Sequence, residues 1–149
     1  MTRRKLTLIF TVLFTVSALI LAACGAPVAN AASLKGTNWT LVSLGPVKDQ
    51  VSAVADVHTS LTFGADGQVS GNFGCNSFGG KYEIKDGKIV FSEIISTLMA
   101  CTNEDVMKQE QAGLKILNGE DTYKLEGSTL VIYAASGENA LTLSSVPGK

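Results

Sequence analysis

The residues best suited to chemistry in this chain of 149 residues are three cysteines and a single histidine. The cysteines are Cys24, Cys75 and Cys101, and the histidine is His58. A nucleophilic serine or cysteine usually needs a base within reach, and zinc usually needs several nitrogen or sulfur ligands. Because the cysteines have other expected roles, one histidine can complete neither arrangement. We therefore expect no catalytic residues, no metal site and no cofactor, and we interpret His58 as a residue at a strand edge.

Cys24 follows a segment with the features of an export signal. Residues 3–5 are basic, and residues 6–21 follow without a single charge. Residues 21–24 read Leu-Ala-Ala-Cys, the pattern of a lipobox, in which small residues precede the cleavage site and the cysteine thiol carries diacylglycerol. The alternative is an uncleaved membrane helix, but the apolar stretch is slightly shorter than the about 20 residues that a spanning helix needs.

Cleavage before Cys24 would divide the chain into three parts. We expect residues 1–23 to be a lipoprotein signal peptide, residues 24–33 a lipidated tether and residues 34–145 one folded domain. The domain would then lie outside the cytoplasm, in a bacterial cell envelope, and contact the membrane through lipid on Cys24. Two or more acyl chains make such an anchor stable.

The mature protein would be acidic. The chain has 12 Lys+Arg and 13 Asp+Glu, and three of the basic residues belong to the signal peptide, so cleavage leaves a net charge of −4. Nucleic acids are bound through clustered basic residues, so we expect no nucleic-acid partner. The composition does not identify an envelope protein partner.

Cys75 and Cys101 remain as a pair once Cys24 is assigned to lipid. Disulfides persist outside the cytoplasm, and an even number of remaining cysteines suggests a bridge. Closing a loop of this length would stabilise the domain by roughly 3.5 kcal/mol. The alternative is two reduced, buried thiols.

Most of the domain alternates apolar and polar residues with a period of two, as half-buried strands do. Strands are expected at residues 39–44, 61–63, 82–84, 89–91, 123–125, 130–133 and 140–143. Asp66-Gly67 and Asp86-Gly87 predict type I′ hairpin turns, which need positive φ at both central residues. Residues 45–56 have no clear period and are expected to form a loop. The pattern predicts a mostly β (α+β) fold, a compact antiparallel meander that forms a barrel-like sheet.

One amphipathic helix is expected between residues 103 and 118. Asn103 can cap its first turn, where Glu104 and Asp105 place acids at the positive end of the helix. The residues at helical spacing that follow are Val106, Glu110, Leu114 and Leu117, with Met107 beside them. Asn118-Gly119 ends the run. Such a helix could close one open side or end of the sheet.

A glycine-rich segment spans residues 71–80 and reads Gly-Asn-Phe-Gly-Cys-Asn-Ser-Phe-Gly-Gly. It lacks the Gly-Lys-Ser/Thr ending of a phosphate-binding loop, and a strand rather than a helix is expected after it. Its glycines are suited to bulges and tight bends at a barrel corner. Asp66 opens a stretch resembling a calcium loop, but the twelfth position is Ser77 instead of the required Glu, so a hairpin is favoured.

The same segment resembles the central signature of the META domain family, which includes HslJ-like bacterial lipoproteins. The matching residues are Gly71, Asn72, Gly74, Cys75, Asn76 and Gly80, with Phe73, Phe78 and Tyr82. Residues 34–41 resemble the family's opening strand, and residues 97–101 resemble its second cysteine motif. The resemblance implies a compact, mostly β domain with a short helix, secreted or tethered in the envelope, with Cys75 and Cys101 close together. The family has no established catalytic residues, so none are assigned here.

These observations lead to three functional hypotheses. The first is a non-enzymatic envelope lipoprotein that supports envelope integrity or resistance to stress such as heat shock or antibiotics. The second is a binding module that inhibits an envelope hydrolase such as lysozyme, since an acidic surface complements a basic lysozyme. The third is an enzyme with paired carboxylates, although no pair is singled out by its spacing.

Overall fold

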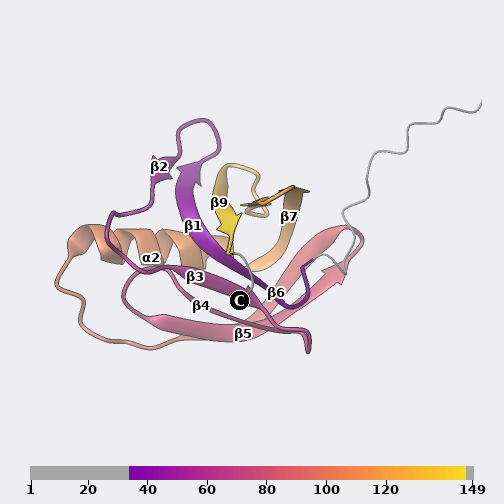
Figure 1. Cartoon of the computed structure of the whole chain (residues 1–149), viewed down its shortest axis with the longest axis horizontal. Coiled ribbons are helices and arrows are strands. Elements are labelled where there is room, and N and C mark those ends of the chain that lie inside the picture. The colour runs from indigo at the N-terminus through magenta and orange to yellow at the C-terminus, as the bar shows by residue number, and fades with distance from the viewer. Residues whose placement is uncertain (1–33, 147–149) are drawn as a thin grey trace, which may run out of the picture.

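The computed structural model describes residues 34–146, and Figure 1 shows how its strands and helix are arranged. The elements are β1 (Thr37–Pro46), β2 (Val51–Ser52), β3 (Ser60–Phe63), β4 (Gln68–Asn72), β5 (Ser77–Lys85), β6 (Lys88–Ser96), α2 (Glu104–Ile116), β7 (Gly119–Glu126), β8 (Thr129–Tyr133) and β9 (Asn139–Ser145). This order confirms the predicted mostly β fold with one helix.

The sheet is an antiparallel meander that closes into a barrel. Consecutive strands from β3 to β9 pair with their neighbours, and β1 pairs with both β3 and β9. β2 adds a short piece beside the second half of β1, where Ser43 pairs with Ser52. Residues 45–56, expected to be a loop, therefore contribute the end of β1 and all of β2.

Apolar side chains from alternate strand positions fill the barrel. Leu61, Phe63, Val69, Ile89, Leu130, Ile132, Leu141 and Leu143 are all at most 1% exposed. The alternation is interrupted in β1, where the pairing with β9 shifts between Leu41 and Ser43. This bulge turns Leu44 rather than Ser43 into the core, because one extra residue reverses the direction of every later side chain.

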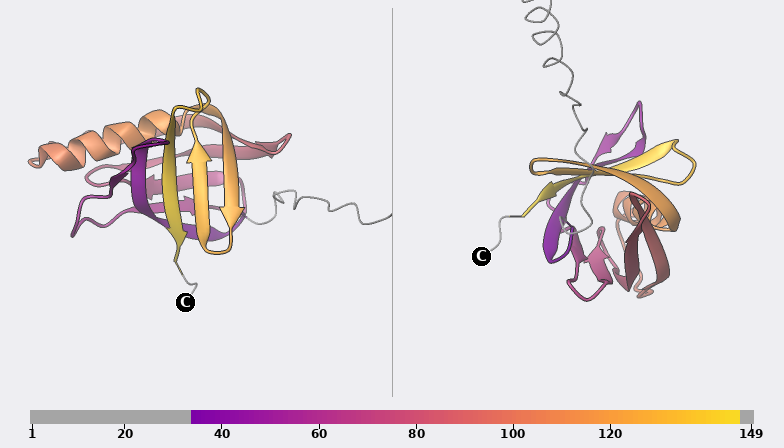
Figure 2. Two further views of the ribbon diagram at one scale, coloured as in Figure 1. Left: turned by 90° about the horizontal axis from the view of Figure 1, so that it is seen from above. Right: turned by 90° about the vertical axis from the view of Figure 1, so that its right-hand side faces the viewer.

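Helix α2 lies across one end of the barrel (Figure 2). Asn103 caps it as expected, because its side chain accepts hydrogen bonds from the N–H groups of Asp105 and Val106. Ile116, and Leu117 after the last turn, join the core of the barrel. The helix therefore closes the barrel end, which is one of the two roles predicted for it.

The two ends of the barrel differ in what they carry. The helix end, as we call it, carries α2, the Phe73–Asn76 turn and residues 97–103. The terminal end carries Leu34 and Val146, the first and last described residues, and Val146 donates a backbone hydrogen bond to Asn38. Figure 2 shows the C-terminal end of β9 pointing away from α2.

The barrel is open on one side near the helix end. β7 pairs only with Lys88–Phe91 of β6, so the remaining part of β6 has a strand partner on one edge alone, which is β5. Among the described residues no strand pairs with the other edge of Ser92–Ser96. The chain leaves β6 here, crosses the helix end as α2, and returns as β7.

The prediction of a type I′ turn is confirmed at Asp86-Gly87 and is wrong at Asp66-Gly67. Asp86 and Gly87 both have positive φ, as that turn requires, but at Asp66-Gly67 only Gly67 does. Gly67 donates to the carbonyl of Gly64, and Gly64 donates to Gln68, which is the pattern of a three-residue loop ending in a left-handed residue. The Asp66 side chain instead accepts a hydrogen bond from the N–H of Gln68.

The predicted signal peptide (residues 1–23), the tether (residues 24–33) and Cys24 lie outside the described residues. Within residues 34–146, α2 is too short and too polar to cross a membrane, and no other helix there could do so.

Candidate functional site

The glycine-rich segment turns the chain between β4 and β5 at the helix end. Only residues 73–76 form the turn, because both strands extend into the segment from either side. The Asn72 side chain organises this turn: its Oδ1 accepts a hydrogen bond from Gly74 N (2.6 Å) and its Nδ2 donates to the carbonyl of Cys75 (3.3 Å). Asn favours such turns because its side chain can bond backbone groups close in sequence.

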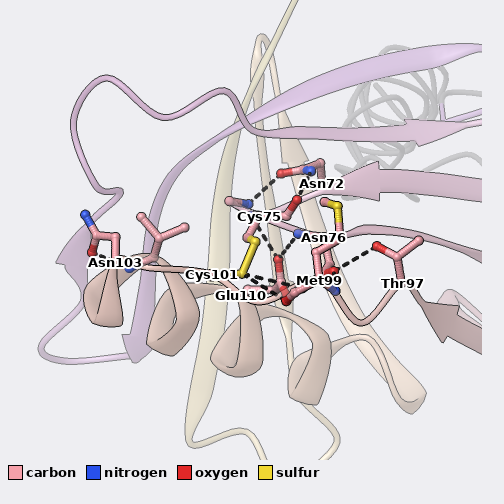
Figure 3. The surroundings of a disulfide bond; sticks show 10 residues. Asn72, Cys75, Asn76, Thr97, Met99, Cys101, Asn103 and Glu110 are labelled. Atoms are coloured by element: carbon pink, nitrogen blue, oxygen red, sulfur yellow. Dashed lines mark hydrogen bonds between the residues drawn. A yellow bond between two sulfur atoms is a disulfide. The ribbon is translucent and has the colours of Figure 1, made fainter.

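Glu110 of α2 binds this turn with its carboxylate (Figure 3). Its Oε2 accepts hydrogen bonds from the backbone N–H groups of Cys75 (3.0 Å) and Asn76. Its Oε1 accepts a third bond from the side-chain amide of Asn76 (2.8 Å). Glu110 is 7% exposed. Three N–H groups of the turn therefore donate to the carboxylate. Such hydrogen bonds offset the cost of burying a polar group away from water.

Asn76 extends the network to the segment that leads into α2. Its Oδ1 accepts hydrogen bonds from Thr97 Oγ1 (2.8 Å) and Met99 N (2.7 Å). One buried amide thus joins the turn, the helix and residues 97–99 (Figure 3). Asn76 accepts through its oxygen and donates through its nitrogen, so both ends of the amide are used.

A disulfide joins Cys75 in the turn to Cys101, two residues before the helix cap. The two Cα atoms are 6.1 Å apart, within the range that a bridge requires. The structure therefore contains the bridge predicted from the cysteine count. It lies beside the Asn76 amide and covalently fixes the connection that the hydrogen bonds also make.

Gln109 makes a second connection that the sequence did not reveal. Its Nε2 donates to the carbonyl of Phe73 (2.6 Å), and its Oε1 accepts from the N–H of Val54 (2.7 Å). Gln109 is almost fully buried, although it is polar and lies beside Glu110 on the helix. The only available signal was that two adjacent polar residues lie on the face of α2 that meets the core.

A comparison with protein-family models matches residues 32–147 to the META domain. The chain belongs to the META domain family. A comparison with curated proteins finds no relative.

Solved structures show the same fold. An NMR structure of a protein from Burkholderia xenovorans has a TM-score of 0.68 and 23% identity, covering 81% of this chain and 89% of that one. A second NMR structure has a TM-score of 0.62 and 20% identity, with 77% and 93% covered. A crystal structure of a DUF4847 family protein from Bacteroides vulgatus has a TM-score of 0.54 and 12% identity, with 78% and 96% covered. At these identities the likeness concerns the fold alone.

The glycines of the META signature stand where a side chain has no room. A Cβ on Gly71 would overlap the carbonyl oxygen of Ser60, and one on Gly74 would lie 2.5 Å from Val106 Cγ1 of α2. A Cβ on Gly80 would lie 2.6 Å from Ile94 Cδ1 and 2.9 Å from the carbonyl oxygen of Ser92. The signature glycines are thus explained by three close approaches, of β4 to Ser60 of β3, of the turn to Val106 of α2, and of β5 to β6.

Among the residues that the structure describes, Asp121 of β7 is the one charged residue whose burial the fold does not explain. It is fully buried, and neither carboxylate oxygen has a hydrogen-bond partner of regular geometry among the described residues. Burial raises its pKa to about 6, and the nearby backbone N–H of Ala135 opposes this shift. Asp121 did not emerge from the sequence, because in β7 it reads as an ordinary polar position.

The predicted signature residues therefore come together, and their contacts connect the turn to the helix and to residues 97–99 instead of leaving groups free to bind a substrate. The side chains of Asn72, Asn76 and Glu110 are hydrogen-bonded to the turn and to residues 97–99. His58 is exposed two residues before β3, so it does not lie at a strand edge as we had expected. Within residues 34–146 no group of three or more His, Cys, Asp and Glu side chains could hold a metal ion.

Proposed function

We propose that this protein is a lipid-anchored cell-envelope protein whose META domain acts without catalysing a reaction and supports envelope integrity under stress. The observation that carries the proposal is the use of the META signature. Its polar side chains bind one another and the backbone, which suits a part that stabilises the domain rather than one that reacts with a substrate.

The anchor follows from the lipobox that ends at Cys24. Leu34, where the described domain begins, lies at the terminal end, so a tether of residues 24–33 would attach that end to the membrane. The helix end would then point away from the lipid surface.

We expect Cys24→Ala to leave the precursor uncleaved and without fatty acid, because the thiol is the attachment atom for the lipid. The test is metabolic labelling with a palmitate analogue in a bacterial host, followed by separation of membrane and soluble fractions. Cys75→Ser is the matched control, since Cys75 is engaged in the disulfide, and it should keep the label. A label retained by Cys24→Ala would remove the anchor from the proposal.

The stress role can be tested separately in the source bacterium. A strain without the protein should survive heat or cell-wall antibiotics less well, and the wild-type chain should restore survival. Cys24→Ala should restore it poorly if the location at the membrane matters. Unchanged survival of the deletion strain under all of these stresses would contradict the role.

Inhibition of an envelope hydrolase is the second candidate, and an exposed apolar loop favours it. Leu98 is 95% exposed and Met99 59% exposed, yet Met99 N and Thr97 are held by the Asn76 side chain. A rigid apolar loop can enter a cleft at little cost in conformational entropy. A basic lysozyme assayed with micromolar protein, and with Leu98→Ser as the comparison, would reveal inhibition that depends on this loop.

A further inference from the structure

The second half of β6 has an edge that no described strand covers. Residues 92–96 pair with β5 on one side only. β7 does not reach them, because its first residue, Gly119, pairs with Phe91. A free strand edge presents backbone N–H and C=O groups that can pair with another extended chain.

Helix α2 forms a second wall opposite this edge. Between the two walls lies a groove of about 400 Å³. Its lining residues are Phe91, Ser92, Glu93, Ile94 and Ser96 from β6, Leu114 from α2, and Leu117 and Asn118 from the residues that follow α2. The groove thus combines strand backbone on one side with the partly buried side chain of Leu114 from the helix on the other.

We propose that this groove binds a basic peptide segment in extended conformation, which adds a strand to the free edge of β6. Peptides bound by strand addition gain affinity from backbone hydrogen bonds and specificity from pockets for alternate side chains. Here an apolar side chain of the peptide would lie between Ile94 and Leu114. The site is independent of the lipid anchor and goes beyond the proposed function.

The charge of the groove determines the kind of peptide. Glu93 is the only charged residue among those that line it, and its exposed carboxylate also forms an ion pair with Lys81 (2.8 Å), which lies outside the groove. The last turn of α2 lies beside the groove, and its carbonyls carry partial negative charge that Lys115 of the same turn offsets in part. Residues 34–146 contain 13 Asp and Glu but only eight Lys and no Arg, so the surrounding field is negative as well. A Lys or Arg in the peptide complements this net negative charge.

The walls also favour a single chain over the edge of another folded sheet. A second copy of this protein would bring its own α2 and neighbouring strands to a space already bounded by α2. The pairing of β5 and β6 shifts between Gly79 and Lys81, next to Glu93, and such bulges hinder edge-to-edge pairing of sheets. An isolated extended segment brings no helix or neighbouring strands, and a single chain can bend at the bulge where a packed sheet cannot.

The probe for the test is a fluorescein-labelled peptide, Lys-Val-Thr-Val-Lys-Val-Thr, added to the full-length chain in lipid nanodiscs. Fluorescence anisotropy measures binding, and hydrogen–deuterium exchange identifies the amides that are protected. We expect saturable binding with protection concentrated in residues 92–96. The same peptide with Glu at both Lys positions should bind at least about tenfold more weakly, as should one with Pro at the internal Val and Thr positions.

Two variants locate the contact. Leu114→Gln removes apolar lining and Glu93→Gln removes the charge, and each should weaken binding about fivefold or more. Glu93 is exposed, so its variant leaves the fold intact even if Leu114→Gln weakens it. Lys108→Gln, on an exposed part of the same helix, should leave binding unchanged. The proposal is overturned by absent binding at millimolar peptide, by equal binding of the Glu peptide, by protection confined to residues 97–101, or by self-association that protects residues 92–96 without peptide.

Discussion

Two buried carboxylates in the META domain have opposite surroundings. Glu110 accepts three hydrogen bonds from N–H groups of Cys75 and Asn76, whereas neither oxygen of Asp121 has a regular hydrogen bond within residues 34–146. A carboxylate is stabilised as an anion by such donors and destabilised by burial without them. The two residues should therefore affect stability in opposite directions when their charge is removed.

Glu110→Gln should lower the free energy of unfolding by about 2–4 kcal/mol. The new amide nitrogen is a donor, and it would face N–H groups of the turn that are donors themselves. Urea unfolding followed by tryptophan fluorescence gives the value, since Trp39 lies in the core. Glu104→Gln on the first turn of the same helix is an exposed control and should change stability by less than about 0.5 kcal/mol. Similar losses for both variants would show that the turn does not depend on the Glu110 carboxylate.

Asp121→Asn should stabilise the protein at neutral pH. Because burial raises the folded-state pKa from 3.8 to about 6, the folded state favours the protonated form of Asp121. Ionising the buried Asp121 therefore lowers the free energy of unfolding. This loss is absent below about pH 4, grows as pH rises to about 6, and is constant above that, where it reaches about 2–3 kcal/mol. The stability difference between Asp121→Asn and wild type, measured from pH 4 to 8, should follow this course. The exposed control Asp49→Asn should show no such growth, and a flat difference for Asp121→Asn would contradict the assignment.

At the scale of elements, the bulge between β5 and β6 explains why Gly80 is a glycine, and it places Glu93 in an unfavourable backbone conformation. Gly80 allows the backbone of Ser92 and Glu93 to approach closely. Glu93 has a φ of +56°, a left-handed conformation that side chains with a Cβ rarely adopt. The bulge therefore uses a glycine on one strand and a strained glutamate on the other.

Glu93→Gly should raise the free energy of unfolding by about 0.5–1 kcal/mol, because glycine adopts this conformation without strain. The change also removes an ion pair with Lys81, but both side chains are more than half exposed, so that pair contributes little. Ser92→Gly, the neighbouring control in the same strand, should instead lose about 0.5–1 kcal/mol. Thermal unfolding of both variants tests the contrast, and a loss of stability in Glu93→Gly would show that the charge matters more than the strain.

Local sequence patterns predicted the elements well and their connections poorly. Periodicity placed every strand that it named inside an observed strand, and the Asn103 cap placed the start of α2. The bulge at Val42 and the loop at Asp66-Gly67 depend on pairing across strands, which a single strand's pattern does not contain. The Asn76–Glu110 bond joins residues 34 apart, so no spacing rule could find it, although the family resemblance had already marked Asn76.

At the scale of the whole molecule, the two ends of the barrel carry different features. The terminal end holds Leu34, which would receive the tether, and the helix end holds the signature turn, α2 and the exposed Leu98. Between β6 and α2 the chain has no strand pairing, so the Asn76 network and the Cys75–Cys101 disulfide hold residues 97–103 in place. Any surface that this end offers to a partner depends on those links.

The disulfide should therefore contribute to both stability and the order of the helix end. It closes a loop of 26 residues, and its loss by Cys75→Ser with Cys101→Ser should lower the free energy of unfolding by about 2–4 kcal/mol. Hydrogen–deuterium exchange should then show faster exchange in residues 97–103, while β8 and β9 at the opposite side of the barrel stay protected as long as the protein remains folded. The reduced wild-type protein is the matched comparison and should behave like the double variant. If exchange instead rises equally in all strands, the bridge stabilises the barrel as one unit, and the helix end has no separate dependence on it.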